Sequence, residues 1–368
     1  MFRRLYPDIF KKTWKTVTVE ELTFAALGLP IVADRTTAQT YMAYDIGKGT
    51  WSDEILGKAG FRKNLLPDIT DCGSIIGEIG VDVSGRLGLS RKVKVVAGGH
   101  DQPVADFGAG LTAPGTAVDS LGTVESIGIV MKKPRLDNSF MNCGFSNLCH
   151  VYGGLTFTNV YNFAAADLLN WFSRVFCNAK KGRELPVLKS LLANLPKKPA
   201  SVLVLPHFPG SGTPYLDSSS RGTITGLHFG LTRPEIFRAI VDFQNYEMRL
   251  NLEMWRRFGI KPDRLRVYGD LSRSDVLLQV KADILDLEVV RLGNTEMGCF
   301  GAAVLAGIGT GRILDAADFL KENVRETRVF SPRPKYREQH EALYRSYRRL
   351  YGAVKEINHN LARIQSGP

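Results

Sequence analysis

Short β-branched segments alternate with helical segments from about residue 90 onward, and this alternation limits the folds that the chain can adopt. The apolar segments are five or six residues long and are bounded by glycine, which is typical of strands inside a sheet. They are VKVVA (93–97), AVDSL (117–121), IGIVM (127–131), SVLVL (201–205), RLRVYG (264–269) and EVVRL (288–292). Helical patterns cover 164–176, 234–258, 274–285, 296–308 and 338–364. This order predicts an α/β fold, in which helices cover a sheet.

The longest internal helical pattern has a recognisable start and one apolar face. Thr232 is followed three residues later by Glu235, which is the spacing of a capping box. Ile236, Ile240 and Phe243 then recur at helical spacing. We therefore expect a helix that is capped at Thr232 and that turns these three side chains into the core.

The length of 368 residues favours two domains. Hydrophobic residues make up 44% and charged residues 23%, close to the globular average, which excludes disordered, collagen-like and coiled-coil classes. The glycine-rich loop GAGLTAPG indicates a boundary near residues 110–116. We expect domains at 1–112 and 113–368.

The net charge of +11 favours an anionic partner, such as a nucleic acid, an acidic membrane surface or a phosphorylated small molecule. The basic residues are dispersed over predicted turns and helix surfaces, so we expect solvated faces rather than a nucleic-acid site. The longest apolar stretches fall short of the roughly 20 residues that span a bilayer, so no membrane partner is expected.

Cysteine usage indicates a reduced compartment. The five cysteines are an odd number without a CxxC pair, so we expect a cytoplasmic protein without a disulfide framework. Cys143, Cys149 and His150 match no common zinc spacing. No metal ligand is assigned on this chain.

The segment VVAGGHDQPVADFGAG (95–110) runs from a strand through two glycines to His100, Asp101 and Gln102. Open α/β sheets bind ligands at the carboxyl ends of their strands, where an acid can accept a proton from a substrate hydroxyl and an amide can hold its neighbour. The alternative is that Asp101 merely caps the following helix. The segment alone favours the cap.

A second candidate is DSLGTVES (119–126), in which Gly122 and Thr123 separate two strands. The amide groups and the hydroxyl of such a hairpin can cradle a phosphate. Gly-Thr hairpins are common, however, and a purely structural turn is the default explanation of the segment by itself.

A third candidate is VYGDLSRSDVLLQVKADIL (267–285), a strand followed by a tight loop and a helix start. A nucleotide can bind at such a helix N-terminus. A carboxylate at Asp270 would repel phosphate oxygens, and Ser274 is expected to cap the helix whether or not a nucleotide binds.

In this order and spacing the three segments resemble the FGGY family of carbohydrate kinases. The resemblance runs from about residue 5 to about residue 355. It also includes ADRTTAQTYMAYDIGKGTWSDEIL (33–56), LPDITDCGSIIGEIG (66–80), FPGSGTPYLDSSSRGTITGL (208–227) and TEMGCFGAAVLAG (295–307). It implies the actin- and hexokinase-like fold, in which two ribonuclease-H-like domains surround an ATP cleft.

The resemblance also implies a role for each matching residue. Asp101 would be the general base that takes the proton from the sugar hydroxyl, and His100 and Gln102 would touch the substrate. ATP and Mg²⁺ would be the co-substrate and the metal cofactor. The nucleotide would contact Gly122 and Thr123 in a phosphate-binding turn, Ala166 and Asn170 in NFAAADLLNWF (162–172), and Gly269, Asp270 and Ser274 in the adenosine loop.

The front of the chain departs from the family pattern. Relatives begin with a D-x-G-T/S phosphate hairpin, whose aspartate helps to hold magnesium, and we expect this N-terminal region to be absent here. The first domain would then be truncated, with an unpaired sheet edge and exposed apolar surface. Such a surface predicts a homo-oligomer or poor solubility.

These observations predict an ATP-dependent carbohydrate kinase that transfers a phosphoryl group to a hydroxyl of a small sugar or polyol. The alternative is a degenerate, non-catalytic member of the same fold that binds a nucleotide or sugar or serves as a subunit. The sequence does not select the sugar, because most contacts that choose it lie in the family's N-terminal region.

Overall fold

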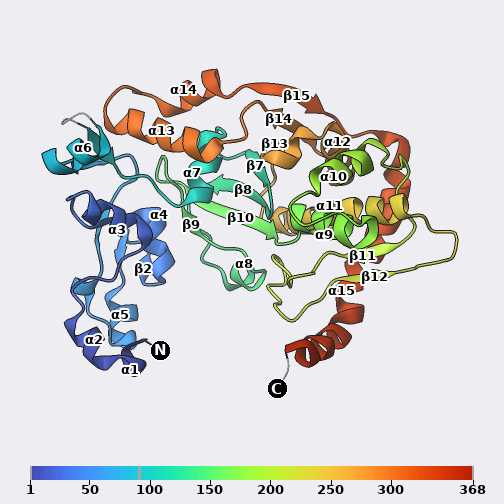
Figure 1. Cartoon of the computed structure of the whole chain (residues 1–368), viewed down its shortest axis with the longest axis horizontal. Helices are drawn as coiled ribbons and strands as arrows, with labels where there is room; N and C mark the ends of the chain where they lie inside the picture. Colours follow the sequence, from blue (N-terminus) through green and yellow to red (C-terminus); the bar gives the residue numbers. More distant parts are fainter. Residues whose placement is uncertain (1, 90–92, 367–368) are drawn as a thin grey trace.

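The fold is built around one seven-stranded sheet, which lies at the centre of the computed structural model in Figure 1. The structure describes residues 2–89 and 93–366. Across the sheet the strand order is β15-β14-β13-β7-β8-β10-β9. The strands are β7 Thr116–Leu121, β8 Glu125–Met131, β9 Leu148–Cys149, β10 Thr156–Asn162, β13 Arg264–Tyr268, β14 Glu288–Leu292 and β15 Glu326–Phe330.

The three central strands β7, β13 and β14 are parallel, and each outer strand is antiparallel to its inner neighbour. The pairing of β7 with β13 extends to Ser120 opposite Tyr268. Because the two strands are parallel and in register, the chain leaves both of them at the same edge of the sheet. Residues that are far apart in sequence therefore meet there.

Two helices cover each face of the sheet, which explains why the central strands are apolar on both sides. The neighbours Ala117 and Val118 are both fully buried, in different cores on opposite faces. One core includes Trp255 of α11, and the other includes Met297 of α13. The helices are α11 Arg233–Arg257 and α12 Asp275–Leu285 on one face, and α7 Asp101–Gly108 and α13 Met297–Gly309 on the other.

Helices α7 and α13 pack at backbone contact. A Cβ atom on Gly301 of α13 would lie 2.1 Å from the carbonyl oxygen of Val104 in α7, so only glycine fits there. This close approach fixes α7, and with it the segment that precedes the helix, against the sheet.

A third core joins the remaining C-terminal elements. Phe172, Phe237 and Tyr347 are buried in it and come from α9, α11 and α15. The long helix α15, drawn in red in Figure 1, leads to the C-terminus. The additional elements are α8 Asn138–Asn142, α9 Ala166–Cys177, α10 Leu185–Ala193, β11 Leu203–Leu205, β12 Thr223–Thr225, α14 Ala316–Asn323 and α15 Arg337–Ser366.

The N-terminal residues form a smaller region beside the large sheet, drawn in blue in Figure 1. Its strands make three separate pairs, and Trp51 and Leu66 belong to a small core of its own. Large apolar side chains here face solvent, among them Trp14, Val19 and Met42. The elements are α1 Phe2–Leu5, α2 Pro7–Lys12, α3 Val19–Ala26, β1 Val32–Asp34, α4 Arg35–Ala38, β2 Tyr44–Asp45, β3 Thr50–Trp51, α5 Asp53–Ala59, β4 Asp68–Thr70, β5 Ile75–Glu78, α6 Val81–Leu87 and β6 Lys94–Val96.

All the strands and helices that the sequence predicts are present, with ends that differ by at most two residues. Two of the strands, β6 and β11, belong to small two-stranded sheets rather than to the central sheet. The described residues include no helix that is both long and apolar enough to cross a bilayer.

The predicted capping box at the start of α11 is confirmed. Thr232 and Glu235 exchange the expected side-chain and backbone contacts, and the Glu235 carboxylate accepts hydrogen bonds from the amide and hydroxyl of Thr232 at 2.8 and 2.6 Å. Ile240 and Phe243 are fully buried, as expected, and Ile236 is partly buried against the same core.

We predict that Thr232→Ala lowers the free energy of unfolding by about 1 kcal/mol, because the first turn of α11 loses its cap. Urea denaturation measures the change. Thr23→Ala, at an exposed position inside α3, is the matched control and should have a smaller effect. Equal losses in the two variants would contradict the cap's contribution.

Candidate functional site

The candidate site lies where β7 and β13 end side by side. Gly122 follows β7 directly and Gly269 follows β13 directly. Gly269 has φ +96°, and a Cβ atom on it would lie 2.7 Å from the carbonyl oxygen of Leu121. The turn after β7 and the loop after β13 are therefore in backbone contact, although the sequence separates them widely.

The turn at Gly122 and Thr123 is held by the start of α9. The Gly122 amide donates to the carbonyl of Val124 at 3.2 Å, which closes the turn. The amides of Ala165 and Ala166 donate to the carbonyls of Thr123 and Gly122 at 3.3 and 3.2 Å. Thr123 is exposed at the tip, so its hydroxyl is accessible to a ligand. Ala166 is thus in direct contact with the turn.

Asn170 lies on α9 one turn beyond Ala166 and is partly exposed. The hydrogen bonds to the turn at Gly122 and Thr123 come from Ala165 and Ala166 at the start of α9, not from Asn170. Asn170 is therefore linked to the turn only by lying on the same helix as Ala166, and its predicted contact with a nucleotide stays a prediction.

The loop after β13 leads into helix α12. Ser274 is the N-cap residue, and its hydroxyl accepts a hydrogen bond from the amide of Leu277 at 3.4 Å, as the sequence predicts. The side chain of Asp270 is 90% exposed, and Arg273 Nε lies 3.8 Å from its carboxylate. Solvent and this guanidinium both weaken the field that Asp270 exerts on an anion.

The segment GGHDQ lies at the start of α7. The His100 amide donates to Thr36 Oγ1 at 2.7 Å, and His100 Nδ1 lies 3.2 Å from Asp101 Oδ1. His100 occupies the N-cap position, and the Asp101 carboxylate accepts the amide of the next residue, Gln102, at 2.7 Å. The Asp101 side chain is 94% exposed. Asp101 is therefore the first residue of α7 rather than its N-cap, and its carboxylate, although it accepts the Gln102 amide, faces solvent.

Gln102 joins α7 to the end of β13. Its Nε2 donates to Asp106 Oδ1 at 3.0 Å and to the hydroxyl of Tyr268 at 3.3 Å, and the Tyr268 hydroxyl donates to Asp106 Oδ1 at 3.2 Å. Burial raises the pKa of Asp106 well above its usual range, against the hydrogen bonds from Gln102 and Tyr268. The segment that carries Asp101 is thereby tied to the strand that carries Gly269.

The three predicted segments therefore meet at one edge of the sheet. The contacts that join them are made by Gln102, Gly122, Ala166 and Gly269. Asp106 and Tyr268 are not among the residues that the sequence motifs predict. The signal for Asp106 was present, because it follows Gln102 by four residues on a helix that is otherwise apolar.

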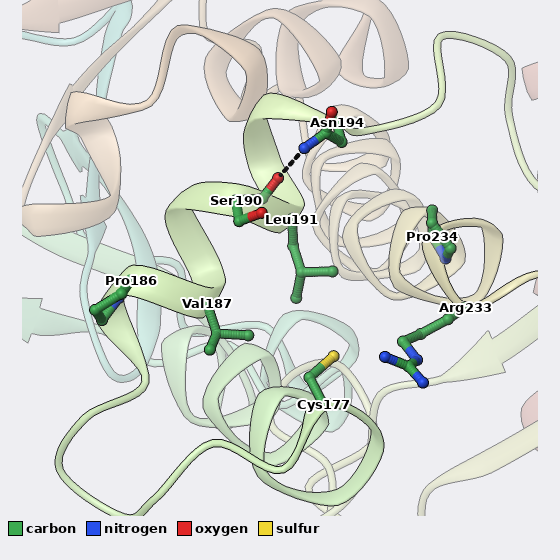
Figure 2. A pocket seen from close by; sticks show the side chains of 8 residues that line it. All are labelled: Cys177, Pro186, Val187, Ser190, Leu191, Asn194, Arg233 and Pro234. Atoms are coloured by element: carbon green, nitrogen blue, oxygen red, sulfur yellow. Dashed lines mark hydrogen bonds between the residues drawn. The ribbon is translucent and has the colours of Figure 1, made fainter.

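The cavity in Figure 2 lies elsewhere, between the end of α9, helix α10 and the start of α11. Its volume is about 660 Å³ and it contains none of the predicted site residues. Arg233 is the charged side chain at its rim in Figure 2, beside apolar and small polar groups. The lining residues are Cys177, Pro186, Val187, Ser190, Leu191, Asn194, Arg233 and Pro234.

Two family models match the chain. The C-terminal domain of the FGGY family of carbohydrate kinases matches residues 120–310, and the N-terminal domain matches residues 2–108. The xylulose kinase of Bacillus subtilis is 26% identical over 356 residues, which are 96% of this chain and 69% of the relative. The glycerol kinase of Pediococcus pentosaceus is 28% identical over 332 residues, which are 89% of this chain and 63% of the relative.

The fold is also found among solved structures. The crystal structure of xylulose kinase from Rhodospirillum rubrum has a TM-score of 0.84 to this chain at 24% identity, covering 97% of this chain and 71% of the other. This likeness confirms the expected actin- and hexokinase-like α/β fold.

The matches correct one expectation. We expected the chain to lack the family's N-terminal region, but the N-terminal domain is recognisable over residues 2–108. The chain spans 69% and 63% of the lengths of the two sequence relatives.

We predict that Gly269→Ala destabilises the protein by about 1–3 kcal/mol, because alanine is strained at this positive φ and its Cβ would collide with the Leu121 carbonyl. Thermal and urea unfolding measure the loss. Gly352→Ala is the matched control: it lies inside α15, no atom lies within 4 Å of the place that its methyl group would take, and the change should be neutral or stabilising.

We predict that Asp106→Asn changes how stability depends on pH. The unfolded carboxyl ionises near pH 4, whereas the raised pKa keeps the folded carboxyl protonated at higher pH. The wild-type free energy of unfolding therefore falls, relative to the variant, as pH rises above 4 toward the folded-state pKa.

Urea denaturation of both proteins between pH 4.5 and 8 tests this prediction. The difference should widen in favour of Asp106→Asn with increasing pH. Asp82→Asn, at an exposed position on α6, should give a flat difference. A flat difference for Asp106→Asn as well would show that the group is ionised in the folded protein.

Proposed function

This chain belongs to the FGGY family of carbohydrate kinases, and from that premise we propose that it transfers the γ-phosphoryl group of ATP to a hydroxyl of a small sugar or polyol. The observation that carries the proposal is the meeting of three segments at the ends of β7 and β13. One segment offers a carboxylate, one a phosphate-sized turn and one a loop at a helix N-terminus. Phosphoryl transfer needs these parts held in fixed relation.

Asp101 is the proposed general base. Its carboxylate is exposed at the start of α7, and its neighbour Gln102 is anchored on Tyr268 at the end of β13. A positioned carboxylate can take the proton of the attacking hydroxyl as the bond to phosphorus forms. His100 and Gln102 flank it and are the proposed substrate contacts.

The nucleotide is proposed to bind along the turn and the loop. Gly122 and Thr123 would face phosphate oxygens, while Gly269, Asp270 and Ser274 would line the side toward the adenosine, with Ala166 and Asn170 of α9 opposite. These positions rest on the contacts between Gly269 and Leu121 and between Ala166 and Gly122.

Mg²⁺ is proposed to arrive with ATP. Within the described part of the chain no three His, Cys, Asp or Glu side chains converge to hold a metal. Mg²⁺ commonly takes one or two carboxylates together with phosphate oxygens and water, and so does not require such a cluster. When bound, the ion would neutralise charge that develops on the phosphates.

The substrate class is proposed from the relatives. One acts on xylulose and the other on glycerol, as their names state, and both substrates carry a primary hydroxyl. We therefore propose a ketose or a polyol with a terminal hydroxyl as acceptor.

A coupled assay of ADP release tests the function directly. The purified chain is incubated with Mg-ATP and a panel that includes xylulose, other ketoses and pentitols, and glycerol, with mass spectrometry of the product. ADP and a phosphorylated acceptor in equal amounts support the proposal. Mg-ADP binding by calorimetry without turnover on any acceptor would replace it with a non-catalytic nucleotide-binding protein.

We predict that Asp101→Asn lowers kcat by about 100- to 10,000-fold, because the amide cannot accept the proton. The KM for Mg-ATP should change by less than about threefold and the melting temperature should stay the same, since the side chain is exposed. Asp8→Asn on α2 is the matched control with wild-type kinetics. Wild-type kcat in Asp101→Asn would assign the base to another group.

A further inference from the structure

A buried cation lies beneath the proposed phosphate turn. Lys281 Nζ is 2.9 Å from Asp119 Oδ2 and also contacts Glu125 Oε1 at short range. The three side chains are 2%, 0% and 2% exposed. The three residues lie within two of the sequence motifs, but neither the motifs nor the proposed mechanism gives them a role.

Its place in the fold connects the two halves of the candidate nucleotide site. Asp119 lies on β7 three residues before Gly122, and Glu125 opens β8 two residues after Thr123. The two carboxylates thus stand on the two strands of one hairpin, on either side of its turn. Lys281 comes from a different element, helix α12, which begins directly after the adenosine loop.

A buried ion pair of this kind contributes little net stability to a fold. Removing charges from water is costly, and apolar side chains of similar size fill such a space at least as well. Two carboxylates also share a single ammonium group here. Burial raises the pKa of Glu125 to about 7. The positive charge of Lys281 acts in the opposite direction and lowers this pKa, whereas the neighbouring negative charge of Asp119 raises it.

What the group supplies is a fixed geometry. The ladder of β7 and β8 already sets the separation of these strands. The ammonium contacts a carboxylate on each strand and so ties the hairpin to α12, the helix that follows the loop from Gly269 to Ser274. The Gly269 backbone touches Leu121 at the end of the same hairpin. Lys281 thus links the turn to the loop, the two surfaces between which a nucleotide would lie.

We propose that Lys281 is a positioning residue for nucleotide binding, which ties the phosphate turn at Gly122 and Thr123 to the helix that follows the adenosine loop. This inference rests on the proposed function, because it assigns a support to that same site. Lys281 itself is buried and does not touch the nucleotide.

Calorimetry with Mg-ADP tests the proposal on the full chain. In Lys281→Met, which keeps the volume and removes the charge, the Kd for Mg-ADP should rise at least tenfold. Lys281→Arg restores a cation and should remain within about threefold of wild type. Lys321→Met, at an exposed position on α14, is the matched control with wild-type affinity.

A merely structural role makes a different prediction. Lys281→Met would then lower the melting temperature while the Kd, measured well below unfolding, stayed at its wild-type value. Hydrogen exchange of residues 116–131 without nucleotide provides a second readout, and should accelerate in Lys281→Met but not in Lys281→Arg. An unchanged Kd in the folded Lys281→Met variant overturns the proposal.

Should Lys281→Met fail to fold, the double variant Lys281→Met/Glu125→Gln replaces it. The pair removes one charge of each sign and leaves Asp119 able to bind a proton, and the same tenfold rise is expected. Failure of the proposed function is distinguishable, because the wild-type chain would then bind no Mg-ADP. If the wild type and the double variant bind Mg-ADP with the same Kd, the positioning role of Lys281 is overturned while the proposed function stands.

Discussion

The parallel pairing of β7 with β13 is the interaction on which the candidate site depends. It runs to Ser120 opposite Tyr268, so the chain emerges from both strands at one edge of the sheet. The turn at Gly122 and the loop at Gly269 then touch through their backbones, where a side chain would not fit. The start of α7 reaches the same edge through the hydrogen bond from Gln102 to Tyr268.

Polar groups are buried beneath this edge, where apolar residues would cost less. Asp106 sits under the start of α7, and Asp119, Glu125 and Lys281 sit under the turn, all almost fully inaccessible. Each of these groups links two elements that approach the site from different directions. Directional contacts of this kind fix relative positions, which non-directional apolar packing does less well. The energetic cost of burying these groups is thus accompanied by a more precise relative placement of the elements that they link.

The local parts of this arrangement were predictable from the sequence, and the non-local parts were not. The capping box at Thr232, the cap at Ser274 and the turn at Gly122 follow from patterns within a few residues. The partners of Lys281 lie more than 150 residues away, so no local pattern identifies them. A signal did exist, since Lys281 follows Leu277 by four residues and precedes Leu285 by four, and so lies on the apolar face of its helix.

The turn is supported on three sides before any ligand binds: by the amides at the start of α9, by the Gly269 loop and by Lys281 from below. Groups held in this way need little rearrangement when charge develops on a transferred phosphoryl group, which is the main source of rate in such reactions. The exposure of Asp270 bears on the repulsion that the sequence predicts between its carboxylate and phosphate oxygens. Its carboxylate is 90% exposed and near Arg273, so water and the guanidinium screen its repulsion of an anion. A solvated negative charge is therefore tolerable at the rim of the proposed phosphate site, whereas beneath the turn two buried carboxylates share the buried ammonium of Lys281.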